Sequence, residues 1–128
     1  MTHDRAVVLF GHGARDPAWA QPMERVRDTL RARAPELGVE LAFLEFLAPT
    51  LDEAIDALVA RGARRIVIVP MFIARGGHLK NDLPKLVAAA CERHPGCKIV
   101  QVLAVGEAEP VVAAMASYAR QCAIEDDD

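Results

Sequence analysis

Four short runs of apolar, largely β-branched residues alternate along the chain with four segments of helical periodicity. Parallel strands must be joined by crossover segments, which are usually helices. The alternation therefore predicts an open α/β domain with one four-stranded parallel sheet and helices on both faces. Right-handed crossovers favour the strand order 2-1-3-4. We expect the strands near residues 6–10, 39–46, 65–69 or 65–71, and 98–105.

The 128 residues suffice for one domain of this kind, and no linker or internal repeat divides them. We expect the domain to span residues 1–124 and the acidic residues 125–128 to form a solvated tail. The tail dominates the net charge of −3, because the remainder holds 15 basic and 14 acidic residues. A nearly neutral body lacks the electrostatic footprint of a nucleic-acid binder.

Two further features bear on the compartment of the protein. No apolar run approaches the ~18 residues of a membrane span, and the first residues lack the cationic start of a secretory signal. Cys91, Cys97 and Cys122 are odd in number and show no C-x-x-C spacing, which indicates reduced thiols rather than a disulfide framework. We therefore expect a cytoplasmic protein without a membrane partner.

The helical segments carry start and stop signals. Asp16 and Pro17 are suited to open the first helix, whose apolar face is predicted to carry Met23, Val26 and Leu30. The second helix begins with Thr50-Leu51-Asp52-Glu53, a capping-box pattern, and Gly62 can end it. We expect a loop over residues 72–80, a third helix capped by Asn81 or Asp82, and a last helix over residues 109–122. The predicted inward positions of the second and third helices are Leu51, Ile55, Leu58, Val59, Leu83, Leu86, Val87 and Ala90.

Two histidines and one glutamate are predicted to meet at one end of the sheet. His12 follows the first strand, His78 follows the third, and alternation places Glu45 at the far end of the second. In open α/β sheets, ligands bind beyond the carboxyl ends of the strands where the strand order reverses. Each residue alone could be an ordinary loop or surface residue, but the conjunction of all three indicates a site.

Neutral imidazole and carboxylate suit divalent ions such as Co²⁺, Ni²⁺, Fe²⁺ or Zn²⁺, and they suit proton transfer near neutral pH equally well. Glycines beside the histidines would let a large flat ligand approach the backbone, although tight turns could also require them. Cationic side chains in the same loops would attract a ligand with several carboxylates. The predicted ligand-binding residues are Gly11, Gly13, Arg15, Arg75, Gly76, Gly77 and Lys80.

These positions together resemble the short sirohydrochlorin chelatases, and in particular the cobaltochelatase of anaerobic cobalamin synthesis, which is related to sirohydrochlorin ferrochelatase. The resemblance covers the chain from the first strand to the fourth. It rests on three motifs, namely Gly11-His12-Gly13-x-Arg15-Asp16-Pro17, Glu45 followed by Pro49-Thr50-Leu51, and Pro70-x-Phe72-Ile73-x-x-Gly76-x-His78-x-x-x-Asp82-x-Pro84.

The resemblance implies insertion of a divalent metal, Co²⁺ or alternatively Fe²⁺ or Ni²⁺, into the tetrapyrrole sirohydrochlorin with release of two protons. It implies that His12, Glu45 and His78 handle the metal and the protons, that no organic cofactor takes part, and that two chains form a homodimer. Ala14 stands where the family often has Ser, and neither a His-rich tract nor iron–sulfur cysteines are present. Metal choice and metal supply are therefore left open.

Two other functions compete with this interpretation. A tetrapyrrole or metal carrier, or a degenerate copy without turnover, would use the same three side chains for binding alone. A phosphohistidine enzyme could also place a glycine-flanked His after its first strand, but the histidine phosphatases carry Arg directly before that His, where this chain has Gly11.

Overall fold

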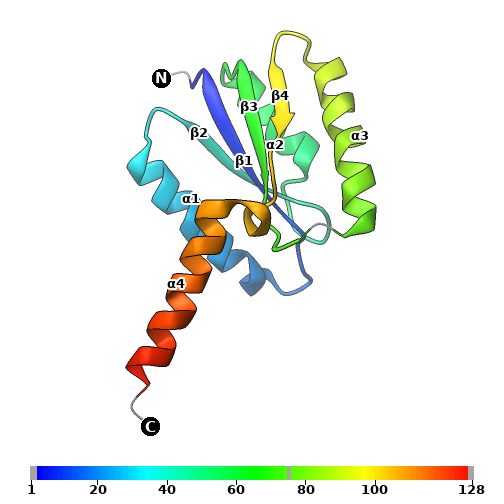
Figure 1. Cartoon of the computed structure of the whole chain (residues 1–128). Helices are drawn as coiled ribbons and strands as arrows, with labels where there is room; N and C mark the ends of the chain where they lie inside the picture. The colour runs from blue at the N-terminus through cyan, green and yellow to red at the C-terminus, as the bar shows by residue number, and fades with distance from the viewer. Residues whose placement is uncertain (1–2, 75, 127–128) are drawn as a thin grey trace.

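The computed structural model describes residues 3–74 and 76–126 and confirms the predicted α/β fold. Four parallel strands form one sheet in the order β2-β1-β3-β4 (Figure 1). The carboxyl ends of β1, β2 and β3 therefore lie next to one another, as the site hypothesis requires. The strands span Arg5–Gly11 (β1), Gly38–Phe43 (β2), Arg65–Pro70 (β3) and Lys98–Gln101 (β4).

Helices lie on both faces of this sheet. Helix α1 packs against β1 and β2 on one face, whereas α2 and α3 pack on the other. Helix α4 packs on neither face and extends away from the carboxyl edge of the sheet (Figure 1). No helix in the described part of the chain is long and apolar enough to cross a membrane. The helices span Gln21–Arg33 (α1), Leu51–Ala60 (α2), Gly77–Arg93 (α3) and Glu109–Glu125 (α4), with short 3-10 turns at Pro17–Ala20 (η1) and Val105–Glu107 (η2).

Alternation along the strands creates two apolar layers. On the α2 and α3 face, side chains such as Phe10, Ile68 and Leu83 are fully buried. On the α1 face, Leu9 and Leu41 belong to a smaller cluster of buried apolar side chains. Burying an Ile, Leu or Phe side chain stabilises the fold by roughly 1.5–3 kcal/mol, so the larger layer supplies most of the hydrophobic stabilisation. The predicted inward positions of α2 and α3 are confirmed, with Val59, Leu86 and Val87 partly buried.

Most of the predicted helix signals are confirmed, with one refinement at α1. Thr50 and Glu53 form both hydrogen bonds of a capping box, and Gly62 adopts a positive φ of 98° after α2. Asp16 caps η1 rather than α1 itself, through a bond from the Ala18 amide. On α1, Met23 and Leu30 pack toward the sheet, but Val26 is 42% exposed, contrary to its predicted inward position.

Two strands are shorter than predicted. Strand β2 ends at Phe43 rather than near residue 46, because the chain bends and Phe46 takes a left-handed φ of 68°. Strand β4 ends at Gln101 rather than near residue 105, and one further bond, from the Val102 amide to the Ile68 carbonyl, precedes η2. In both cases apolar residues continue past the end of the strand, namely Leu44 and Phe46 after β2 and residues 102–105 after β4, so hydrophobicity overstated the strand.

The start of α3 was also predicted wrongly. The helix begins at Gly77, with Gly76 as its N-cap, instead of after a loop to residue 80 with Asn81 or Asp82 as cap. The Lys80 amide donates to the Gly76 carbonyl at 3.0 Å. Leu79 is 7% exposed and continues the buried stripe one turn upstream of Leu83, which explains why packing extends the helix.

Candidate metal-handling site

His12 and Glu45 meet at the carboxyl edge of the sheet. His12 directly follows β1, and Glu45 lies in the bend that follows β2. The imidazole Nε2 is 2.9 Å from the Glu45 Oε1, so the two form a hydrogen bond. Their side chains are 59% and 48% exposed. The pair is thus accessible to a ligand arriving from solvent.

The backbone continues the strand pairing beyond the formal strand ends to bring this pair together. The Leu44 amide donates to the Gly11 carbonyl at 2.9 Å, and the Glu45 amide donates to the His12 carbonyl at 3.1 Å. These two main-chain hydrogen bonds therefore fix the positions of His12 and Glu45 relative to each other. The predicted proximity of His12 and Glu45 is explained by this register.

Gly13 is required at its position by geometry. Its φ is +93°, and a Cβ built there would lie 1.9 Å from the Glu45 carbonyl oxygen. Any side chain would push the Glu45 segment away from His12. Gly11 is also closely approached, but by the flexible Met23 thioether rather than by backbone.

Aromatic side chains flank the histidine and the adjoining bend. The Phe72 ring stands edge-on to the His12 ring, with centroids 6.4 Å apart and planes at 89°. Phe72 also contacts the buried Phe10 ring at 6.2 Å, which ties it to the core. On the other side, the Arg15 guanidinium lies over the Phe46 ring at 4.8 Å, within cation–π range.

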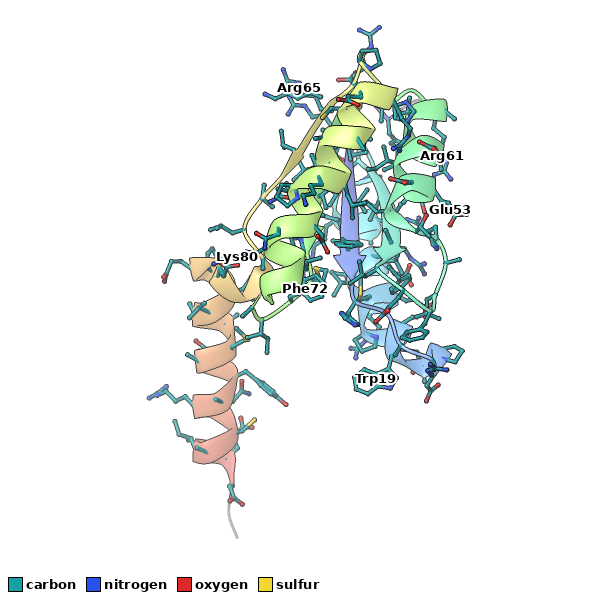
Figure 2. The ribbon with its side chains drawn as sticks, turned by 90° about the vertical axis from the view of Figure 1, so that its right-hand side faces the viewer. Trp19, Glu53, Arg61, Arg65, Phe72 and Lys80 are labelled. Atoms are coloured by element: carbon teal, nitrogen blue, oxygen red, sulfur yellow. The ribbon has the colours of Figure 1, made fainter. Side chains whose placement is uncertain are left out.

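Helix α3 follows β3 in the chain and begins at the same edge of the sheet. His78 lies in the first turn of α3, and the side chain of His78 is outside what the structure describes. Lys80, in the same turn, is exposed, and Figure 2 shows it near the lower end of α3. Arg75 lies outside the described residues.

Gly76 and Gly77 show no steric need for glycine. No heavy atom of the described chain lies within 4 Å of a Cβ built at either position, and Gly76 has an ordinary extended conformation with φ −68°. A tight turn therefore does not account for them. Among the described residues, nothing fills the space beside Gly76 and Gly77 at the start of α3.

His12 and Glu45 form a two-residue donor set in the described structure. No group of three or more His, Cys, Asp or Glu side chains is arranged to hold a metal ion among the residues described, which omit the His78 side chain. A carboxylate only accepts hydrogen bonds, so Nε2–H of a neutral His12 donates to Glu45 and Nδ1 carries the lone pair. Such a pair can accept a proton or bind a divalent ion loosely.

Sequence reasoning missed the apolar rim of this site. Leu44 and Phe46 next to Glu45, Trp19 beyond Asp16, and Ile73 after Phe72 are large side chains that are 39–74% exposed. Large apolar residues that remain exposed beside a polar pair are typical of a ligand-binding surface. The sequence signal that could have identified this rim is that these large apolar residues lie in the segments that follow β1, β2 and β3.

The fold and the site together define an α/β domain that presents a His–carboxylate pair at a topological switch point. The sequence profile of the CbiX family matches residues 6–122, and the chain belongs to this family. A CbiX protein from Marinobacter aquaeolei shares the fold with a TM-score of 0.82 at 21% identity, over 95% of this chain and 99% of that one.

Proteins named sirohydrochlorin cobaltochelatase are also similar to this chain. The chain is 37% identical to a sirohydrochlorin cobaltochelatase of Methanococcus aeolicus over 70% of its length, and 39% identical to one of Methanopyrus kandleri over 64%. The matched segments span 63% and 57% of those two relatives. The sirohydrochlorin chelatase SirB of Bacillus subtilis subspecies spizizenii, solved with cobalt, has a TM-score of 0.76 and 29% identity, over 94% of this chain and 51% of SirB.

Proposed function

We propose that this protein is a chelatase that inserts a divalent metal ion, foremost Co²⁺, into sirohydrochlorin. The observation that carries the proposal is the exposed His12–Glu45 pair at the carboxyl edge of a CbiX-family domain. The names of the relatives support the substrate and the metal, since those proteins are sirohydrochlorin cobaltochelatases and SirB was solved with cobalt.

The proposed reaction exchanges one metal ion for two protons. The M²⁺ ion forms bonds to the ring nitrogens while two pyrrole N–H bonds break, and the two protons leave for acceptors on the protein and then for solvent. His12 is the proposed first acceptor, because its neutral ring has one free nitrogen lone pair. Glu45 is proposed to stabilise the imidazolium that forms, through the existing 2.9 Å contact. His78 is proposed as the second metal-handling and proton-accepting group.

The surroundings of the pair suit the proposed substrate. The exposed apolar side chains Leu44, Phe46 and Ile73 offer a surface for a flat macrocycle. Arg15 and Lys80 offer positive charge to its carboxylates, and Gly76 and Gly77 leave room for its edge. Because His12 and Glu45 are about half exposed, a metal ion bound there is proposed to exchange readily, which a metal-delivering site requires.

The proposal also includes the expected oligomeric state, cellular location and alternative substrate metal of the protein. We propose a homodimer, because the resemblance to the short chelatases implies one and because the exposed His12–Glu45 pair leaves one side of a bound ligand open. A cytoplasmic location fits the three free thiols of Cys91, Cys97 and Cys122. Fe²⁺ is proposed as an alternative substrate metal, since SirB was also solved with Fe³⁺.

An anaerobic absorbance time course with sirohydrochlorin and Co²⁺ tests the function. Metallation faster than the spontaneous rate, reduced about 10²-fold or more in His12→Ala, is the expected result. His94→Ala is the matched control, because this histidine lies at the other end of α3, and it should retain the rate. Tetrapyrrole binding without any acceleration would instead identify a carrier and overturn the proposal.

A further inference from the structure

Phe46 is a large aromatic residue that the fold holds out in solvent beside the His12–Glu45 pair. It is 55% exposed and belongs to neither apolar cluster, whereas Leu47 next to it packs on the α1-face cluster. Continued alternation from Ala42 would turn position 46 toward the α2 and α3 face. The chain instead departs from strand geometry at this residue.

A strained three-residue turn produces this departure. The Leu47 amide donates to the Glu45 carbonyl at 2.9 Å, and Phe46 between them has a left-handed φ of 68°. A hydrogen bond between residues two apart around a positive φ is the pattern of the rare, strained kind of γ-turn. Positive φ is unfavourable for a bulky residue and persists where the surroundings enforce it, often at ligand sites. The turn therefore indicates a function for the exposed ring.

The turn is joined to the loop that follows β1. The Glu45 amide donates to the His12 carbonyl at 3.1 Å, and Gly13 approaches the Glu45 carbonyl so closely that only glycine fits. Arg15 lies two residues beyond Gly13. The backbone that carries Arg15 is therefore held against the backbone that carries Phe46.

The Arg15 side chain lies over the Phe46 ring as a result. Its guanidinium carbon is 4.8 Å from the ring centroid, which is a cation–π contact. An arginine can stack on an aromatic face while its N–H groups remain free to bind a carboxylate in a bidentate manner. The ring thus restricts the guanidinium without using its hydrogen-bond donors.

No acidic group in the described part of the chain neutralises this guanidinium. Among the residues that the structure describes, no ion pair includes Arg15. The Asp16 carboxylate next to it accepts from the Ala18 amide, and the Glu45 carboxylate is bonded to His12. A positioned guanidinium without an acidic partner is suited to bind an external carboxylate.

We propose that Phe46 is a positioning residue that presents the Arg15 guanidinium to a carboxylate on the rim of the ligand. The inference rests on the proposed function, since it assigns a contact to the ligand of that site. Arg15 selects a ligand with peripheral carboxylates, and the Phe46 ring sets where on the rim such a carboxylate must lie relative to His12. The strained turn is retained because a relaxed turn would release the guanidinium into solvent.

Binding of uroporphyrin, a flat tetrapyrrole with carboxylates around its rim, tests this role without a metal and without turnover. Quenching of the porphyrin fluorescence gives the dissociation constant. We expect it to rise roughly 10-fold in Phe46→Leu, which keeps an apolar side chain but removes the aromatic face. Phe46→Tyr restores the ring and should bind nearly as tightly as the parent. Equal weakening in the two variants would contradict the role of the aromatic face.

A combined variant shows whether Phe46 acts through Arg15. Arg15→Gln alone is expected to raise the dissociation constant of uroporphyrin roughly 10-fold or more. Adding Phe46→Leu should raise it little further, because the ring then has no guanidinium to hold. Multiplication of the two single effects would overturn the proposal. Arg33→Gln removes an exposed arginine from the far end of α1 and should bind like the parent, which controls for the general loss of positive charge.

A porphyrin that carries N-methylpyridinium cations in place of carboxylates tests the selectivity. Its affinity should not fall in Arg15→Gln, because the removed guanidinium has no anionic group to bind. An equal loss of affinity for both porphyrins would overturn the proposal, and so would a parent that does not bind uroporphyrin.

Stability distinguishes a positioning role of Phe46 from a structural one. Phe46→Asn introduces a residue that tolerates a positive φ. The midpoint of its urea unfolding should therefore not fall below that of the parent, although its binding of uroporphyrin weakens. A lower midpoint in step with weaker binding would mean that the ring supports the fold, and it would contradict the proposal.

Metallation kinetics separate this inference from the proposed function. In Phe46→Leu we expect a raised KM for sirohydrochlorin with kcat nearly unchanged, because the ring contributes to binding of the rim and not to the exchange of metal and protons. A parent that shows the binding pattern above but no metallation would count against the proposed function only. A metallating parent whose KM is unaltered in Phe46→Leu would count against this inference only.

Discussion

His12 and Glu45 are bonded at 2.9 Å although they are 33 residues apart and both are about half exposed. An exposed pair of this kind contributes only about 0.2–1 kcal/mol to stability. Its position is set instead by the main-chain bonds of Leu44 and Glu45 to the β1 end. The pair therefore contributes little to the stability of the fold, and the role proposed for it lies in the chemistry of the edge.

Replacement of Glu45 by Gln separates these two roles. The amide keeps the shape and can still accept a bond from His12, but it loses the charge that would stabilise an imidazolium. We expect the free energy of urea-induced unfolding to change by less than about 1 kcal/mol, while the metallation rate falls about 10²-fold or more. Glu36→Gln, at an exposed position before β2, is the control and should alter neither quantity. Full activity in Glu45→Gln would show that the carboxylate has no part in the reaction.

Gly13→Ala tests the steric argument for the turn after His12. The added methyl group meets the Glu45 carbonyl oxygen in a backbone conformation that alanine rarely adopts. We expect a loss of about 1–3 kcal/mol in unfolding free energy, and metallation reduced beyond what the lost folded fraction explains. Gly96→Ala is the matched control, because its built Cβ meets no described atom within 4 Å. Equal stability of the two variants would mean that the loop relaxes without cost.

The strands and the two sheet faces could be predicted because period-two and helical patterns are local properties of the sequence. The strand order, and with it the meeting of His12 and Glu45, followed from the general preference for right-handed crossovers. The residues at which strands and helices begin or end could not be predicted in this way. Leu44 and Phe46 continue the alternating apolar pattern of β2 in the sequence, but Phe46 adopts a left-handed conformation that no composition rule indicates. The start of α3 was missed because Gly76 and Gly77 are poor helix formers, and the burial of Leu79 outweighs that local preference.

The course of α4 lay beyond sequence reasoning for a different reason. The sequence predicts a last helix over residues 109–122, and the structure has it at Glu109–Glu125. The direction in which α4 leaves the sheet depends on the short turn around Gly106, whose backbone lies so close to Ile73 that a side chain there would clash. Such contacts between distant segments leave no local signal.

The capping box of α2 makes a measurable contribution to stability. The Thr50 hydroxyl accepts from the Glu53 amide at 3.2 Å, and the Glu53 carboxylate accepts from the Thr50 amide at 2.9 Å. These bonds to Thr50 lower the pKa of Glu53 below its ordinary value. We expect Thr50→Ala to lower the unfolding free energy by about 1 kcal/mol, measured by urea denaturation. Thr29→Ala, in the middle of the exposed side of α1, should cost clearly less, and equal costs would argue against the cap.

The contact between Asp56 and His94 predicts how stability depends on pH. Asp56 Oδ1 is 2.6 Å from His94 Nε2 and 3.1 Å from Arg93 Nη2, so it joins α2 to the end of α3. The bond from His94, and secondarily the contact with Arg93, lowers the pKa of the Asp56 carboxyl. A carboxyl whose pKa is lowered by folding stabilises the protein above its unfolded-state pKa of about 3.9. That contribution is lost as the pH falls through the folded-state pKa.

Asp56→Asn should therefore be less stable than the parent at pH 6, by up to about 1 kcal/mol because Asp56 is half exposed. The difference should shrink progressively as the pH falls below the unfolded-state pKa of about 3.9 and then through the lowered folded-state pKa, because Asp56 becomes protonated in both states of the parent. Urea unfolding at pH 6 and at a series of lower pH values follows this change. Glu92→Gln neutralises a neighbouring exposed carboxylate for which the described residues supply no ion pair, and it should show no such dependence. A parent–variant difference that persists unchanged at low pH would mean that the introduced amide fails to pack, not that a charge interaction was lost.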